Sequence, residues 1–449
     1  MRFSASLNAV VLIGAANAIP THSTAGFDQV LASGTEEHSA RVSNAGPTVD
    51  YQQMNPFDVT PQPDSHERHS HKICWPKGVL PHQDFVDWTL FKANGANLGG
   101  WLEKEKTHDP IWWNSLGDAA AATSDEWSLC EALGDACGSI LEERYESFLN
   151  KSTIDALASV GVNTLRIPTT YTPWVVYPET KLYRGNQLHY LREITTYAIE
   201  NYGMHIIIGL HSLPGGVNNL DIGEGFMHDA WFYNETLLEY SWQAIDSMLH
   251  FIQESGHMNA FTIAPINEAS DDLSNFGSSA GLSDNATNWV IKYMDGVLER
   301  VEAVDKRIPV MLQDNFKGAS FWAPLFDSSH NLVIDSHVYY FAAAGTYSKY
   351  VSYAICGQAS YLAEETKFPV FIGEWSLQVM YNNSLDYRKT MFDTQRYAWQ
   401  KYVSGGTFWT AVSYSTSAVD GEGTQRDYWS YVDLINAGVI TTATNSSYC

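Results

Sequence analysis

Two glutamates, Glu268 and Glu374, each lie at the end of a short apolar run of the chain. Glu268 comes after residues 261–266, and Glu374 comes after residues 371–373. An ionised carboxylate in apolar surroundings is costly without a partner, and for one such residue a structural ion pair is the simplest explanation. Two of them together predict acid–base chemistry, in which a protonated carboxyl donates a proton while an ionised one acts as nucleophile or base. Hydrolysis of a glycosidic bond requires such a pair.

The glutamates belong to a series of eight strand-sized apolar runs that lack strict polar alternation, which is typical of strands buried on both faces. The runs cover residues 91–98, 162–168, 205–210, 260–266, 308–312, 332–338, 369–373 and 406–412. Amphipathic patterns between them predict helices at 152–160, 188–202, 237–255, 289–304 and 386–403. This alternation predicts an α/β fold, a (β/α)8 TIM barrel with enlarged loops in a single domain.

An open, doubly wound sheet is the alternative arrangement for such a pattern. That fold places a glycine-rich phosphate-binding turn after its first strand. Residues 94–100 contain glycines but not in the G-x-G-x-x-G order. The barrel is therefore favoured.

In a barrel, the residues at the carboxyl ends of the strands gather at one rim. The predicted strand ends would bring together Arg166, His211, Asn267, Glu268, His337, Tyr339, Glu374 and Trp409. Each has a structural alternative when taken alone: a histidine satisfied in the core, a tryptophan packed in the core, or an arginine in an internal ion pair. Asn97 could simply end the first strand. Their shared rim favours the functional interpretation.

The amino-acid composition excludes some classes of binding partner. An aromatic content of 13% over 449 residues excludes disorder as the general state of the chain. The 26 basic and 51 acidic residues give a net charge of −25, which repels nucleic acid and anionic lipid surfaces. We therefore expect an uncharged substrate, no nucleic acid partner and no membrane span, and a chain that is a monomer.

The N-terminus predicts secretion. Residues 1–18 resemble a signal peptide, with Arg2, an apolar stretch at 9–16 and an A-x-A sequence ending at Ala18. The apolar stretch is too short to span a bilayer, so the expected location is extracellular. Residues 19–84 begin with a Ser-, Thr-, Pro- and His-rich stretch without apolar periodicity, which predicts a flexible leader or propeptide rather than a metal-binding tract. The barrel domain would then cover residues 85–449.

Two residue types agree with a secreted protein. N-x-S/T sequons, candidates for N-glycosylation, begin at Asn150, Asn234, Asn285, Asn382 and Asn445. The five cysteines are too few for a disulfide scaffold and too scattered for a zinc site. Cys130 and Cys137 are close enough in sequence to bridge a short loop. The odd total leaves at least one thiol free or paired between chains.

Five motifs resemble glycoside hydrolase family 5, and more closely its fungal exo-β-1,3-glucanase branch. They are Asn97–Leu102, Asn163–Pro168, Asn267–Glu268, His337–Tyr339 and Gly373–Ser376. Each motif is short, but five in order on successive predicted strands are specific, and the resemblance covers nearly all of residues 85–440.

The resemblance implies a (β/α)8 barrel, retention of the anomeric configuration, and neither metal nor other cofactor. It implies that Glu268 is the acid/base and Glu374 the nucleophile. The other implied roles are Arg166 holding Glu374, Asn267 contacting the sugar 2-hydroxyl, His211, His337 and Tyr339 lining the first subsite, and Trp409 forming a platform under the sugar ring. The activity that the resemblance implies is that of a secreted retaining β-glycosidase, which hydrolyses β-glucosidic bonds in exo fashion in a neutral β-linked glucan or glucoside.

Departures from the branch leave the substrate open. Ala269 stands where the branch has Pro after the acid/base, and residues 209–221 and 112–138 differ from its usual loops. These changes resemble the related fungal diglycosidases, which release a disaccharide such as rutinose from flavonoid glycosides. A diglycosidase is therefore the alternative. A non-catalytic carbohydrate-binding barrel is a distant third, because such a protein is expected to have lost a carboxylate or Arg166.

Overall fold

Eight parallel strands close into a barrel. The computed structural model describes residues 84–218, 220–225, 230–442 and 449. The strands pair in chain order, and β8 returns to pair with β1. They are β1 (Ala93–Asn97), β2 (Thr164–Thr169), β3 (His205–Leu210), β4 (Phe261–Ala264), β5 (Val310–Gln313), β6 (Leu332–Val338), β7 (Val370–Trp375) and β8 (Gly405–Phe408). The predicted (β/α)8 barrel is confirmed.

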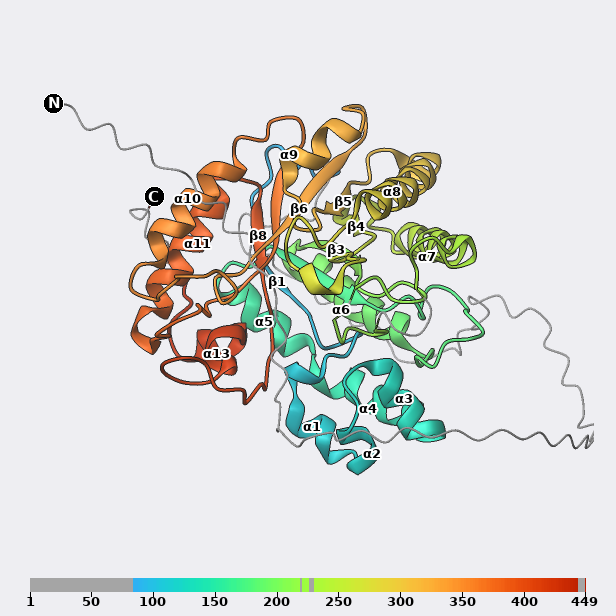
Figure 1. The fold of residues 1–449 in the computed structure, drawn as a ribbon, viewed down its shortest axis with the longest axis horizontal. Helices are drawn as coiled ribbons and strands as arrows, with labels where there is room; N and C mark the ends of the chain where they lie inside the picture. The colour runs from blue at the N-terminus through green and yellow to red at the C-terminus, as the bar shows by residue number, and fades with distance from the viewer. Residues whose placement is uncertain (1–83, 219, 226–229, 443–448) are drawn as a thin grey trace, which may run out of the picture. The chain divides into compact units, whose positions relative to one another are not determined.

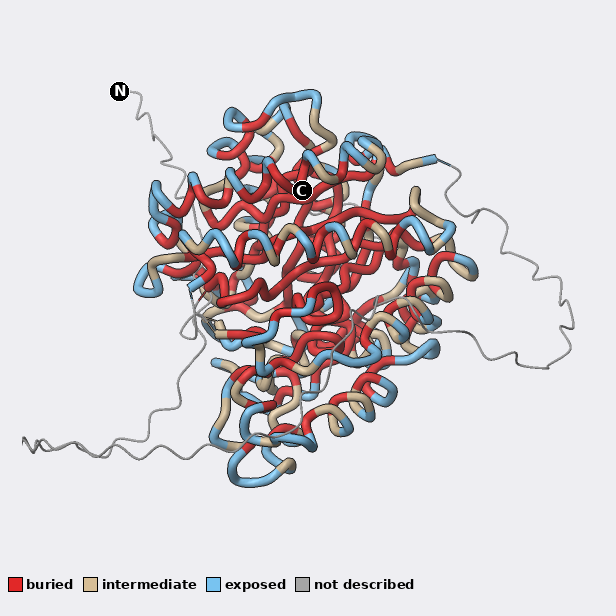
Figure 2. Tube along the Cα trace, turned by 90° about the vertical axis from the view of Figure 1, so that its right-hand side faces the viewer, coloured by how far each residue is buried: buried red, intermediate tan, exposed pale blue. Residues whose placement is uncertain are grey.

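Helices surround the barrel, with α7 and α8 on one side and α10 and α11 on the other (Figure 1). The helices that follow β1 in the chain are α1 (Pro110–Ser115), α2 (Asp118–Ala121), α3 (Glu126–Leu133), α4 (Cys137–Phe148) and α5 (Lys151–Ser159). The later ones are α6 (Gln187–Tyr202), α7 (Glu235–Glu254), α8 (Asp284–Asp305), α9 (Ala319–Trp322), α10 (Val351–Leu362), α11 (Arg388–Tyr402), α12 (Gln425–Trp429) and α13 (Tyr431–Asn436). Buried residues fill the strands and the inner helix faces (Figure 2).

The strands form where the sequence is apolar without alternation, because both of their faces are covered. Every residue of β2, β3, β6 and β7 is buried. The predicted runs at 205–210 and 332–338 match β3 and β6, whereas the other runs are shifted by a few residues. The shifts arise because Ile266 and Ala411 are as buried as strand residues although they lie in loops that cover the core.

Two helices begin earlier in the chain than their apolar pattern predicts, because polar side chains cap their N-termini. We expected a helix from residue 289, but α8 begins at Asp284 because the Ser283 side chain accepts a hydrogen bond from the Ala286 amide. Likewise α7 begins two residues early because Asn234 caps it. Capping residues are polar, so they fall outside an apolar periodicity.

Residues 112–138, which the family resemblance places in a loop, are largely helical. This segment holds α1 to α3 and the start of α4, and it has its own apolar cluster of Trp113, Ala120 and Leu129. The Asp125 capping box starts α3. The short helices carry too few apolar residues to show a periodicity.

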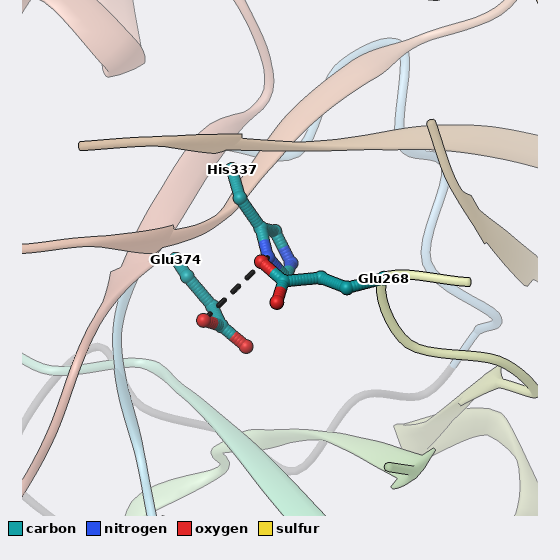
Figure 3. A group of neighbouring side chains, drawn as sticks. All are labelled: Glu268, His337 and Glu374. Atoms are coloured by element: carbon teal, nitrogen blue, oxygen red, sulfur yellow. Dashed lines mark hydrogen bonds and ion pairs between the residues drawn. The ribbon is translucent and has the colours of Figure 1, made fainter. Parts of the chain in front are cut away.

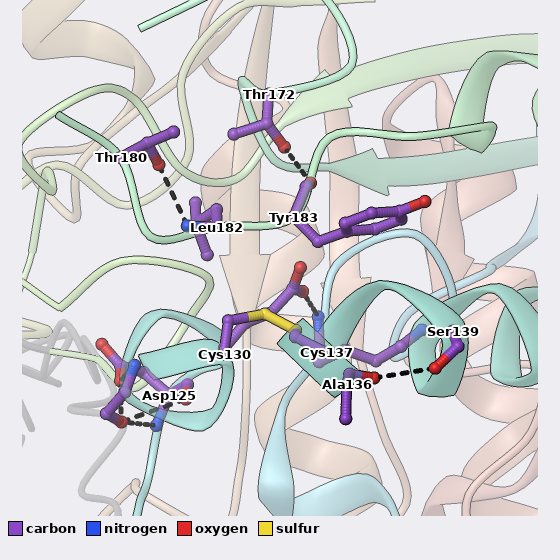
Figure 4. The surroundings of a disulfide bond; sticks show 12 residues. Asp125, Cys130, Ala136, Cys137, Ser139, Thr172, Thr180, Leu182 and Tyr183 are labelled. Atoms are coloured by element: carbon purple, nitrogen blue, oxygen red, sulfur yellow. Dashed lines mark hydrogen bonds between the residues drawn. A yellow bond between two sulfur atoms is a disulfide. The ribbon is translucent and has the colours of Figure 1, made fainter. Parts of the chain in front are cut away.

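Two disulfide bonds link the described residues. Cys130 in α3 is bonded to Cys137 at the start of α4, as their spacing allowed (Figure 4). Cys356 in α10 is bonded to Cys449. Cys74, the predicted signal peptide and leader, and the Asn445 sequon lie outside the described residues. Among the described helices, none combines the length and apolar character needed to cross a bilayer.

The two disulfides are expected to contribute unequally to stability. They close stretches of 93 and 7 residues. Because the entropy removed from the unfolded chain grows with loop length, replacing both Cys356 and Cys449 by Ala is expected to cost about 2 kcal/mol more than replacing Cys130 and Cys137. Denaturant unfolding without reductant measures the difference, and equal losses would contradict the prediction.

Candidate active site

The side chains of Glu268, His337 and Glu374 meet at the carboxyl ends of the barrel strands (Figure 3). Glu374 lies in β7 and His337 in β6, where the strand register pairs them directly. Glu268 lies four residues beyond the end of β4. All three are buried, and the two carboxyl groups point toward one another with the imidazole beside them. The sequence-based prediction that the two glutamates face each other therefore agrees with the structure.

The two carboxyl groups lie close together. An oxygen of Glu268, an oxygen of Glu374 and a ring nitrogen of His337 all lie within 4.8 Å of one another. Glycosidases that invert configuration keep their carboxyl groups about 6.5–9.5 Å apart to admit water, whereas retaining ones keep them about 5–5.5 Å apart. This arrangement has the short separation, which suits attack by one carboxylate itself.

Two donors hold the Glu374 carboxylate. Arg166 Nη1 donates a hydrogen bond of 2.8 Å to Oε1, and the Tyr339 hydroxyl donates one of 2.8 Å to Oε2. Burial raises the pKa of Glu374, and the positive charges of His337 and Arg166 oppose that rise. These charge-assisted bonds stabilise the ionised form and fix the direction of its oxygens.

Arg166 connects four strands of the barrel. Its guanidinium donates to Asn97 Oδ1 at 3.0 Å and to Asn267 Oδ1 at 2.9 Å, besides its bond to Glu374. Asp335 lies 3.5 Å from the same group. Burial alone would lower the pKa of Arg166, but Asp335 and Glu374 raise it, so the guanidinium is a permanent positive charge inside the barrel.

Asp335 is a site residue that the sequence analysis missed. It is two residues before His337 in β6, a spacing that places both side chains on one face of a strand. An acidic residue inside an apolar strand run was the signal that could have identified it. Asn97, for which only a strand-ending role was considered, also belongs to the site, because its Nδ2 donates to the Gly373 carbonyl at 2.8 Å.

The His337 imidazole is protonated and contacts Glu268. Its Nδ1 lies 2.7 Å from Glu268 Oε1, and its Nε2 lies 3.7 Å from Asp335 Oδ2. Burial alone would lower the pKa of His337, but Glu374 and Asp335 raise it to about 10. The imidazole therefore carries a proton at neutral pH and faces Glu268 Oε1.

His211 and Trp409 form a stacked pair beside Glu374. Their ring centroids are 5.6 Å apart with an interplanar angle of 10°, and His211 Nε2 lies 3.9 Å from Glu374 Oε1. Burial and the charge of Arg166 lower the pKa of His211 well below its usual value, so this imidazole is neutral. The structure brings all eight sequence-predicted site residues into one cluster.

The neighbouring Trp375 does not belong to this cluster, because it packs against Phe408 in the core.

The distances between Glu268, His337 and Glu374 would also suit a metal ion. Their contacts do not favour one. Both oxygens of Glu374 already accept hydrogen bonds from Arg166 and Tyr339, and His337 Nδ1 faces Glu268. The positive charges of Arg166 and His337 would repel a cation at this position.

The known proteins that resemble this chain are glycoside hydrolases. The family described as Cellulase (glycosyl hydrolase family 5) matches residues 138–415. A probable glucan 1,3-beta-glucosidase A of Aspergillus niger is 28% identical over 289 residues, which make up 63% of this chain and 65% of that protein. Glucan 1,3-beta-glucosidase 1 of Schizosaccharomyces pombe is 26% identical over 296 residues, 65% of this chain and 69% of that protein. The chain thus spans about two thirds of the length of these curated relatives.

A solved structure is more similar. The rutinosidase from Aspergillus niger is 46% identical, and the match covers 80% of this chain and 100% of that one with a TM-score of 0.77. The predicted fold and family are therefore confirmed.

His337 is expected to make stability depend on pH. Its folded-state pKa of about 10 lies above the ordinary value of 6.5. Its contribution to the free energy of unfolding is therefore fully present below pH 6.5 and is lost as the pH rises through 10. We expect the stability of the wild type to fall more steeply between pH 7 and pH 10 than that of His337→Asn. Denaturant titrations across this range check it, and parallel curves would contradict it.

Proposed function

Because the chain belongs to glycoside hydrolase family 5, we propose that it hydrolyses β-glucosidic bonds in exo fashion with retention of configuration. The observation that carries this proposal is the pair Glu268 and Glu374, whose oxygens approach within 4.8 Å. One carboxylate is held by Arg166 and the other contacts a protonated imidazole. Their different surroundings separate the roles of nucleophile and acid.

The first step forms a glycosyl ester. A Glu374 oxygen attacks the anomeric carbon while Glu268 donates a proton to the glycosidic oxygen, and the bond between that carbon and oxygen breaks. The attacking carboxylate loses negative charge as the ester forms. Arg166 and Tyr339 keep the attacking group oriented because each holds one of its oxygens.

The second step releases the sugar. Glu268, now a carboxylate, removes a proton from water, and the water oxygen attacks the anomeric carbon. The ester bond breaks and Glu374 becomes a carboxylate again. Two inversions at the same carbon give net retention, and Glu268 regains the proton that it donated.

The remaining site residues are proposed to bind the sugar. Both ring nitrogens of the neutral His211 lack a hydrogen-bond partner among the described residues, and we assign His211 to the lining of the first subsite. Asn267 would contact the 2-hydroxyl, and His337 and Tyr339 would line the same subsite. Trp409, whose ring stacks on His211, is proposed to form the apolar platform under the C–H face of a sugar.

A non-catalytic binding protein is disfavoured by the same contacts. A barrel that only binds carbohydrate has no need for two glutamates at this separation. Here both are present, and each has a hydrogen-bond partner of its own, Arg166 for Glu374 and His337 for Glu268. Burying these charges costs folding stability, and a site that only binds a neutral sugar has no need of them.

Two substrates are compatible with this chemistry. The curated relatives named as glucan 1,3-beta-glucosidases support removal of glucose from a β-1,3-glucan. The second candidate is release of a disaccharide such as rutinose from a flavonoid glycoside. The observation that favours it is the 46% identity to a rutinosidase along that chain's full length.

An extracellular location is part of the proposal. The two disulfides are typical of oxidising compartments. Of the sequon asparagines in the described residues, Asn150, Asn285 and Asn382 are exposed and Asn234 is partly exposed, so all four are accessible to glycosylation.

Glu374→Gln is expected to lower kcat by at least about 10⁴-fold, because an amide cannot form the glycosyl ester. Initial rates on an aryl β-glycoside, with circular dichroism to confirm folding, measure the loss. The anomer first formed by the wild type should be β, as followed by nuclear magnetic resonance. A first product in the α configuration would overturn retention.

A product panel separates the two substrates. Laminarin, rutin and hesperidin are incubated with equal amounts of enzyme, and the sugars released are identified by chromatography. The higher identity to the rutinosidase leads us to expect an intact disaccharide from rutin or hesperidin. Glucose from laminarin would favour the glucanase instead, and no release from any of the three would contradict the proposed function.

A further inference from the structure

The backbone of Glu268 has a left-handed conformation, with φ of +46°. Residues with a Cβ rarely adopt this conformation, because the Cβ crowds the neighbouring carbonyl. Such a conformation persists only where the surroundings impose it. Something other than the intrinsic preference of the chain must therefore hold the proposed acid/base in place.

Gln313, the last residue of β5, holds the amide of Glu268. Its Oε1 accepts hydrogen bonds from the Glu268 amide at 3.2 Å and from the Asn315 amide at 2.8 Å. Only the oxygen of the carboxamide can accept both, so the orientation of the Gln313 side chain is determined. Gln313 is 1% exposed, and its Nε2 has no hydrogen-bond partner among the described residues.

Asn218, in the loop after β3, holds the carbonyl of Glu268. Its Nδ2 donates to the Glu268 carbonyl at 3.1 Å and to the Asn267 carbonyl at 3.4 Å. Its Oδ1 in turn accepts a hydrogen bond of 3.0 Å from the Leu220 amide. The peptide groups on the two sides of the Glu268 Cα are thus tied to two different neighbours.

The residue after Glu268 does not restrict it. Ala269 leaves the preceding backbone free, whereas a proline at this position would exclude part of its conformational space. The conformation of Glu268 therefore depends on hydrogen bonds from outside its own segment. The His337 contact at 2.7 Å holds the far end of the side chain but not its backbone.

We propose that Gln313 and Asn218 are positioning residues for the acid/base Glu268. They fix the backbone from which its side chain extends, and hence the position of the carboxyl relative to Glu374 and to the leaving oxygen. This inference rests on the proposed function. Proton transfer requires the donor to lie within hydrogen-bond reach of the oxygen that it protonates, so a displaced Glu268 loses acid catalysis first.

Dependence on the leaving group tests the proposal. Gln313→Met keeps the side-chain length but removes the acceptor. It is compared with the wild type on the 2,4-dinitrophenyl and phenyl glycosides of the sugar that the wild type releases. Dinitrophenolate leaves without protonation, whereas phenolate needs the acid. We expect kcat/KM to fall about 100-fold for the phenyl glycoside and less than about 3-fold for the dinitrophenyl glycoside.

Two further variants make the result specific. Asn218→Ala removes the hydrogen bonds to the Glu268 carbonyl from the other side and is expected to show the same selective loss, which keeps the test valid if Gln313→Met does not fold. Gln187→Met is the matched control. Gln187 is also buried and its Oε1 accepts from the Gly185 amide at 2.7 Å, but it lies at the start of α6. Its ratio of the two substrates is expected to equal that of the wild type.

The outcomes separate this inference from the proposed function. Equal losses on both glycosides, or no loss, in folded Gln313→Met and Asn218→Ala overturn the positioning role while the wild-type activity stands. A selective loss in Gln187→Met would also overturn it, because the effect would then reflect the removal of any buried amide. A wild type inactive on every glycoside overturns the proposed function itself.

Discussion

The site depends on one buried positive charge. The Arg166 guanidinium is fully buried and contacts Glu374, Asn97, Asn267 and Asp335 from four different strands or strand ends. A buried charge is tolerated only when its hydrogen bonds and its countercharge are supplied together. The barrel supplies them by closing on itself, which brings β1, β2, β4, β6 and β7 around one guanidinium. Loss of Glu374 or Asp335 would leave the guanidinium with too little countercharge, and loss of Asn97 or Asn267 would leave one of its N–H groups without an acceptor.

This constraint explains how two chemically identical glutamates acquire different surroundings. Glu374 receives hydrogen bonds from a permanent cation and a tyrosine, which favour its ionised form. Glu268 faces an imidazole that carries a proton. The difference lies in the neighbours and not in the residues, because the ordinary pKa values of two glutamates are the same. The barrel rim therefore gives the two glutamates different electrostatic surroundings.

The backbones of the site residues are fixed in different ways. Glu374 and His337 lie within strands, where ladder hydrogen bonds fix the backbone. Glu268 lies beyond its strand with a left-handed backbone, so neighbouring side chains must fix it. A residue in a loop has more freedom to be placed at the required distance, but it depends on contacts that come from elsewhere in the chain.

Much of this protein follows from the sequence alone. Apolar runs of strand length determine the barrel, because strands buried on both faces cannot tolerate polar alternation, and β3 and β6 match their predicted bounds. The site residues at the strand ends follow from the same topology, since parallel strands end at one rim.

Other features could not be predicted from the sequence. They are the roles of Asp335, Gln313 and Asn218, and the helices between residues 110 and 148. Their roles depend on hydrogen bonds between segments far apart in the chain, such as the 45 residues between Glu268 and Gln313. The sequence determines which residues reach the rim, whereas their distances, their charges and the backbone of Glu268 are decided by tertiary contacts, because electrostatic and hydrogen-bond energies depend on separation in space.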